Sequence, residues 1–142
     1  MVLFKTRKQK HIIEDEIYVL LEHFTDASLK MPMYRIHDLF KCTNCYPLIF
    51  GYFLGAMDYI IEYKNIDSID AKKLFKVYLS TTFTNEDMGN ANDLYEMCKD
   101  LNTSEKGRKY MFIGRMAFKK WLENQPEIVS DLNRMLYDAY IR

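Results

Sequence analysis

The sequence predicts an all-α fold in which about seven helices pack into one compact bundle. Glycine and proline are scarce, with five and three residues, and 49% of the chain is apolar, which argues against a turn-rich β fold and against disorder. Apolar residues recur at helical spacing, and no segment alternates with a period of two. Because 142 residues is the size of one domain, we expect a single core over residues 1–142.

Two helices are expected in the first 41 residues. The first, over residues 10–24, places Ile17 and Leu21 on one face and Glu22 on the other. Residues 1–9 are basic, and we expect them to form a flexible tail ahead of this helix. Pro32 suits the first turn of a helix, which predicts a second helix over 32–41.

The longest apolar stretch predicts the central helix of the bundle. Asn44 can cap a helix over residues 46–63, whose apolar side chains cover nearly every face, as is typical of a buried helix. The stretch stops at Asp58, which makes it too short for a membrane span. Its Gly51-x-x-x-Gly55 spacing predicts that another backbone approaches this helix closely.

Four further helices are expected before the C-terminus, over residues 68–82, 84–101, 104–123 and 126–142. Each begins at a residue that favours a helix start, either by capping free backbone N–H groups or by fitting the first turn. These residues are, in chain order, Ser68, Thr84, Ser104 and Pro126.

Segments 24–65 and 83–124 resemble each other. Phe24-Thr-Asp recurs as Phe83-Thr-Asn, and Phe53-Leu-Gly-Ala-Met recurs as Phe112-Ile-Gly-Arg-Met, in both cases 59 residues further on. Between them, Asp38-Leu-Phe recurs as Asp93-Leu-Tyr after 55 residues, so the match needs gaps between the helices. The pattern predicts two three-helix units and a closing C-terminal helix, in which the helix over 104–123 duplicates the helix over 46–63 but is turned outward. The alternative is chance matching of residues that are common in helices.

One small cluster could hold a metal. Cys42 and Cys45 have the spacing in which two thiolates from one turn bind zinc, and His37 and Cys98 could complete the site. A zinc-stabilised domain is therefore one alternative. The other is that these cysteines are small, buried or helix-end side chains and that the protein has no cofactor. Three cysteines without a signal peptide predict reduced thiols and a cytoplasmic location, or a host cytoplasm if the chain is viral.

The helix over 104–123 carries a basic face. Twenty basic residues balance twenty acidic ones, so attraction to nucleic acid would need a local patch. Arg108, Arg115 and Lys119 share one side of this helix, and aromatic residues including Trp121 are interleaved with its basic residues. The face could bind nucleic acid, bind an acidic protein partner, or be paired internally with the acidic helix over 84–101.

Catalysis is not expected. There is no glycine-rich phosphate loop, no Gly-x-Ser-x-Gly elbow and no His-Glu-x-x-His motif. Asp58 and Glu62 share one helical face but lack a histidine at matching spacing, so solvated or salt-bridged carboxylates are the simpler interpretation.

The sequence therefore predicts a non-enzymatic interaction or regulatory module that binds a protein partner through an aromatic and methionine-rich face. A homodimer formed through the last helix is also expected, because Tyr137 and Tyr140 add surface beyond its apolar stripe. A small nucleic-acid-binding regulator is the main alternative. No membrane association is expected. The candidate partner-binding residues are Arg108, Arg115, Lys119, Trp121, Tyr137 and Tyr140.

Overall fold

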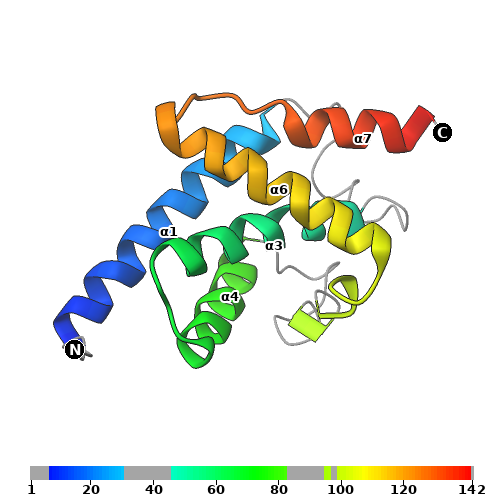
Figure 1. The fold of residues 1–142 in the computed structure, drawn as a ribbon. Helices are drawn as coiled ribbons and strands as arrows, with labels where there is room; N and C mark the ends of the chain where they lie inside the picture. Colours follow the sequence, from blue (N-terminus) through cyan, green and yellow to red (C-terminus); the bar gives the residue numbers. More distant parts are fainter. Residues whose placement is uncertain (1–6, 31–45, 83–94, 97–98, 142) are drawn as a thin grey trace.

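A computed structural model describes residues 7–30, 46–82, 95–96 and 99–141. These residues form helices and no strand, which confirms the predicted all-α class (Figure 1). None of the helices described is long and apolar enough to cross a membrane. Five helices have both ends within the described residues: α1 (Arg7–Leu29), α3 (Tyr46–Tyr63), α4 (Ser68–Thr82), α6 (Glu105–Asn124) and α7 (Asp131–Ile141).

Two predicted helices fall wholly or largely outside these ranges. The helix expected over 32–41 lies outside the described residues, as does most of the one expected over 84–101. Residues 95–96 and 99–101 are helical, in agreement with the predicted end of the latter helix. The bounds predicted for α3 and α4 are confirmed.

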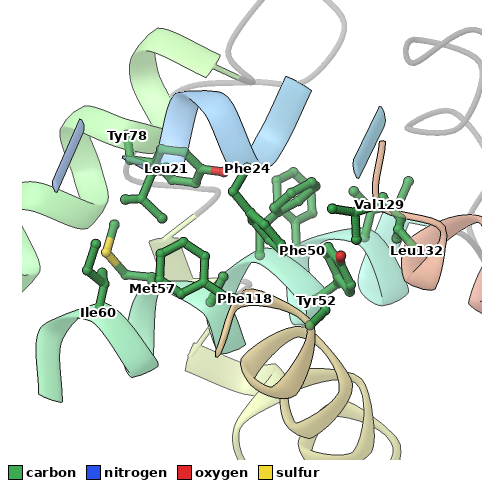
Figure 2. Packing of buried hydrophobic residues seen from close by; sticks show 14 of the residues in the cluster. Leu21, Phe24, Phe50, Tyr52, Met57, Ile60, Tyr78, Phe118, Val129 and Leu132 are labelled. Atoms are coloured by element: carbon green, nitrogen blue, oxygen red, sulfur yellow. The ribbon is translucent and has the colours of Figure 1, made fainter. Parts of the chain in front are cut away.

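The central helix of the bundle is α3, as predicted. It crosses α6 in the middle of the molecule, α4 lies on the side of α3 away from α6, and α1 passes beside both α3 and α6 (Figure 1). Aromatic rings fill the space between α1, α3 and α6. Phe24 of α1 lies 5.6 Å from the ring of Tyr52, 5.0 Å from that of Phe118 and 5.7 Å from that of Trp121, measured between centroids. The core therefore forms around the crossing of three helices (Figure 2).

The α3 and α6 backbones touch at paired glycines. A Cβ atom added to Gly55 would overlap the carbonyl oxygen of Met111, and one added to Gly114 would overlap that of Tyr52. At Gly51 an added Cβ would lie 2.8 Å from the Cβ of Tyr110. The prediction that the Gly51 and Gly55 spacing admits another backbone is therefore confirmed, and that backbone is α6.

The predicted bounds of α1 were too short at both ends, because the helix begins at Arg7 and continues to Leu29. Residues 7–9, expected in a flexible tail, belong to the helix. Beyond Phe24 its inner face continues through small polar side chains that apolar periodicity does not detect. Thr25 donates to the carbonyl of Leu21 at 2.6 Å, and Ser28 is hydrogen-bonded to the Tyr52 hydroxyl at 2.9 Å. Both are buried, and their bonds offset the cost of burial.

Helix caps explain the other boundaries. The prediction that Ser68 caps α4 was wrong: the Asp67 carboxylate accepts the N–H of Asp70 at 2.9 Å, so the cap is one residue earlier. Ser104 caps α6 as predicted, because its hydroxyl accepts the N–H of Gly107 at 2.9 Å. At the far end, Gln125 adopts a left-handed conformation with φ of 46° and ends the helix.

The predicted start of α7 at Pro126 was also wrong, because the helix begins at Asp131. Residues 126–130 are not helical and are hydrogen-bonded to the ends of two helices. The Trp121 indole N–H donates to the carbonyl of Pro126 at 3.1 Å, and the Val129 N–H donates to the carbonyl of Ala27 at 3.0 Å. Hydrophobic periodicity does not reveal either bond: the first closes the loop just after α6, and the second joins this loop to the end of α1, far away in the sequence.

Candidate interaction surface

Helix α6 has two contrasting faces. Its inner face packs against α3 and the aromatic core, and its buried residues recur every three or four positions. This spacing places them on one side of the helix. They are Gly107, Met111, Gly114, Ala117, Phe118 and Trp121.

The centre of the opposite face is apolar and exposed. Phe112 is 62% exposed and Met116 is 38% exposed, and they are four residues apart, so they are neighbours on the helix surface. Large apolar residues scattered singly are common on protein surfaces, but an adjacent pair in the middle of a polar helix face forms a small continuous patch.

Three cations flank this patch. Arg108 and Lys119 lie on one side of the Phe112 and Met116 line, and Lys109 lies on the other. All three are exposed, and none forms an ion pair with an acidic residue in the part of the chain that the structure describes. We call this surface, made of Arg108, Lys109, Phe112, Met116 and Lys119, the outer face of α6.

Arg115, a predicted partner-binding residue, is engaged within the molecule. Its guanidinium pairs with the Glu62 carboxylate and lies 5.4 Å from the centre of the Tyr59 ring, so it links α6 to α3. Beside it, the pKa of Asp58 is raised by desolvation, with Arg115 lowering it and Glu62 raising it. The Glu62 carboxylate thus helps to hold α3 against α6, in agreement with the predicted salt bridge at this residue.

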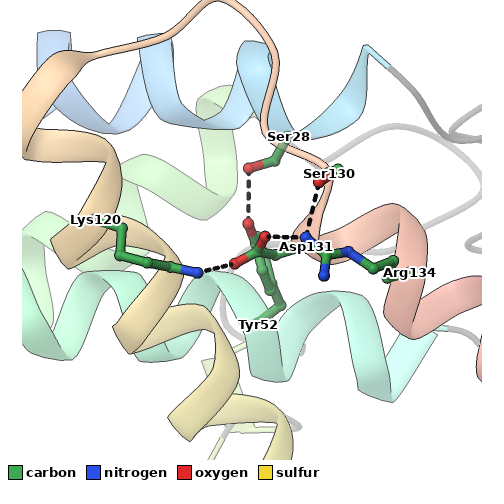
Figure 3. Close-up of polar contacts among 6 residues, drawn as sticks. All are labelled: Ser28, Tyr52, Lys120, Ser130, Asp131 and Arg134. Carbon is green, nitrogen blue, oxygen red and sulfur yellow. Dashed lines mark hydrogen bonds and ion pairs between the residues drawn. The ribbon is translucent and has the colours of Figure 1, made fainter.

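Lys120 also contributes to an internal contact. Its ammonium lies 3.2 Å from the Asp131 carboxylate, at the first residue of α7 (Figure 3). Arg134 is 3.4 Å from the same carboxylate and donates to Ser130 at 3.1 Å. These contacts fix the start of α7 against α6, and Asp131 is favourable at a helix N-terminus.

The remaining predicted partner-binding residues are separated by the fold. Trp121 is 3% exposed and packs in the core, where it cannot meet a partner without rearrangement. Tyr137 is 59% exposed on α7, whereas Leu132, Met135 and Leu136 of the same helix are buried. The side chain of Tyr140 lies outside the described residues.

The zinc candidates His37, Cys42, Cys45 and Cys98 all lie outside the described residues. Within the described ranges no group of three or more histidine, cysteine or acidic side chains could hold a metal ion. A pocket of about 590 Å³ opens between the C-terminal ends of α1 and α6. Its lining includes His23, Asp26, Lys30 and Glu127, a mixture of acidic and basic groups that favours no single ligand charge.

No protein-family model, curated protein or solved structure matches this chain. The surface is therefore interpreted from its own chemistry. Phe112 and Met116 were not among the residues selected from sequence, although a signal was present: two apolar residues with i,i+4 spacing lie at the centre of the polar face of an amphipathic helix.

Proposed function

We propose that this chain is a protein-interaction module that binds an acidic protein partner through the outer face of α6. The observation that carries the proposal is the exposed pair Phe112 and Met116 between cations that lack described acidic partners. Aromatic residues, methionine and arginine are the types enriched where protein interfaces are buried. A partner that supplies apolar and acidic groups would satisfy both parts of this surface.

The exposed part of Phe112 is large enough to act as an anchor. A phenylalanine buries about 150–250 Å² when fully enclosed, so the 62% left exposed corresponds to roughly 90–150 Å². Because full burial of a phenylalanine contributes about 1.5–3 kcal/mol, covering this exposed part contributes roughly 1–2 kcal/mol. Fewer than about 30% of interface residues cost more than about 1 kcal/mol when truncated, so Phe112 would be among the larger contributors to an interface.

The proposal is tested by comparing two double variants with matched chemistry. Phe112→Ser with Met116→Ser removes the apolar centre of the outer face, and Ile69→Ser with Val77→Ser removes two exposed apolar residues of α4. Proteins captured by the unchanged chain from its native host are quantified by mass spectrometry. We expect at least one protein to be lost with the α6 variant and retained with the α4 variant. Equal retention by both variants would contradict the proposal.

Nucleic acid is the second candidate, because Arg108, Lys109 and Lys119 project to solvent as a phosphate-binding helix would require. Of the aromatic residues of α6, however, Phe118 and Trp121 are buried and Tyr110 is partly buried, which leaves Phe112 as the exposed ring on which a base could stack. Oligonucleotide binding that is steeply salt-dependent, lost on Arg108→Ala with Lys119→Ala and kept in Phe112→Ser, would favour this candidate over a protein partner.

A further inference from the structure

The outer face of α6 corresponds residue by residue to a covered face of α3. The two helices cross through reciprocal contacts: Gly55 lies against the Met111 carbonyl, and Gly114 lies against the Tyr52 carbonyl. Each residue of one contact is 59 positions from its counterpart in the other. The crossing therefore treats α3 and α6 alike, and the face of α6 turned away from α3 is equivalent to the face of α3 turned away from α6.

On α3 this face is part of the core. Its central residues, Phe53 and Met57, are buried, and so is Ile60 beside them. The Phe24 ring of α1 lies 6.2 Å from that of Phe53, and Leu21 of α1 and Tyr78 of α4 are buried in the same cluster as Met57 and Ile60 (Figure 2). The equivalent positions of α6 keep the apolar centre as Phe112 and Met116 but are left open.

The flanks of the two faces differ in charge. Where α3 has Ile49, Phe50 and Ile60, α6 has Arg108, Lys109 and Lys119 at the equivalent positions. A helix that covered α6 with apolar side chains alone would leave these three cations desolvated without partners, which is unfavourable. A segment that covers α6 therefore needs an apolar stripe for the centre and carboxylates at its edges.

We propose that the partner docks as an acidic amphipathic α-helix; this inference rests on the proposed function. The bound helix lies across Phe112 and Met116 much as α1 lies across the equivalent face of α3. The molecule itself shows this mode of packing, because α1 meets the core with Ile17, Leu21 and Phe24 at helical spacing. Carboxylates on both edges of the bound helix pair with Arg108 and Lys119 on one side and with Lys109 on the other.

A second copy of this chain is a poorer occupant. The described exposed apolar residues of α4 lie among Lys72, Lys73 and Lys76, which would repel the outer face of α6. The outer side of α1 is acidic, with Asp15 and Glu22, and among its described side chains, residues 15–29, Val19 is the large apolar one that is exposed, against two such residues on α6. Its apolar stripe is already used in the core of its own chain.

The test uses three synthetic helical peptides and the full chain. The first has leucines at i, i+4 and i+7 with glutamates at the edges, the second has lysine in place of each glutamate, and the third scrambles the first. Binding is measured by fluorescence anisotropy, and the contact is located by NMR chemical-shift changes. We expect only the acidic amphipathic peptide to bind, with affinity at least about tenfold higher than that of the other two.

Two variants locate the contact. Phe112→Ser with Met116→Ser is expected to weaken the acidic peptide at least about tenfold, while Ile69→Ser with Val77→Ser leaves its affinity unchanged. Equal binding of the lysine or scrambled peptide would overturn the inference, as would self-association of the unchanged chain that Phe112→Ser abolishes. If an α6-dependent partner is captured but cross-links through an extended or basic segment, this inference fails while the proposed function stands.

Discussion

Phe112 and Phe118 lie on opposite faces of one helix, so truncating each to alanine gives a contrast that depends on the orientation of α6. Phe118 is fully buried, and its ring centroid lies 5.0 Å from that of Phe24 and 5.7 Å from that of Trp121. Phe118→Ala removes these contacts and leaves a cavity among rigid rings. We expect a loss of about 3–5 kcal/mol in the free energy of unfolding.

Phe112→Ala is expected to be close to neutral. Full burial of a phenylalanine contributes about 1.5–3 kcal/mol, and with 62% of the residue exposed the part realised in the folded chain is roughly 0.6–1.1 kcal/mol. Alanine regains about half a kcal/mol through its higher helix propensity. The net loss should therefore stay below about 1 kcal/mol, several-fold less than for Phe118→Ala.

Urea denaturation followed by circular dichroism and by the fluorescence of the single tryptophan, Trp121, measures both values on one chain. Trp121 is buried near Phe118, so its emission reports the core. A loss above about 2 kcal/mol for Phe112→Ala would mean that this side chain is enclosed in the folded protein. The outer face of α6 would then not be free for a partner, and both proposals would be refuted.

Two further predictions concern the core. Gly55→Ala and Gly114→Ala should each cost about 3 kcal/mol in unfolding free energy, because the added Cβ meets a backbone carbonyl. Gly51→Ala should cost less, because its neighbour is the Cβ of Tyr110. A gain in Tm for Gly114→Ala would contradict the close crossing. Burial raises the pKa of the Tyr52 phenol above its ordinary value of about 10. The unfolded chain therefore ionises first, and stability present below about pH 10 is lost as the pH rises, by up to about 1.4 kcal/mol per pH unit. Denaturant titrations should show this loss to be smaller in Tyr52→Phe, and equal losses would contradict it.

Helix type and most helix ends could be predicted from the sequence because their causes are local. The bounds of α3 follow from an apolar stretch, and the start of α6 follows from Ser104 and the hydrogen bond that its hydroxyl accepts. The predicted helix ends are wrong where tertiary contacts determine the boundary. α1 continues past Phe24 because Thr25 and Ser28 find hydrogen-bond partners on α4 and α3, and α7 begins late because residues 126–130 bond to other helices.

The candidate surface was predictable in part for the same reason. The basic side of α6 is visible in the sequence, and Arg108 and Lys119 are exposed as expected. Which cations pair internally depends on the crossing of α3 and α6, which brings Arg115 to Glu62, and on the entry of α7, which brings Asp131 to Lys120. Trp121 was misplaced because helical spacing alone does not say which of two aromatic-bearing faces turns inward.

Helix α6 carries small residues where it meets α3 and large apolar residues on its exposed side, and this distribution bears on its role. Where it crosses α3, the inner face has Gly114, which lets the two backbones touch but buries little side-chain area. Phe112 and Met116 meanwhile remain outside, where they contribute little to the free energy of folding. Folding alone gives no reason to keep two large apolar residues there, since polar side chains at both positions would favour solubility. A partner that covers them supplies that reason, and it makes the outer face of α6 the place where substitutions should separate binding from stability.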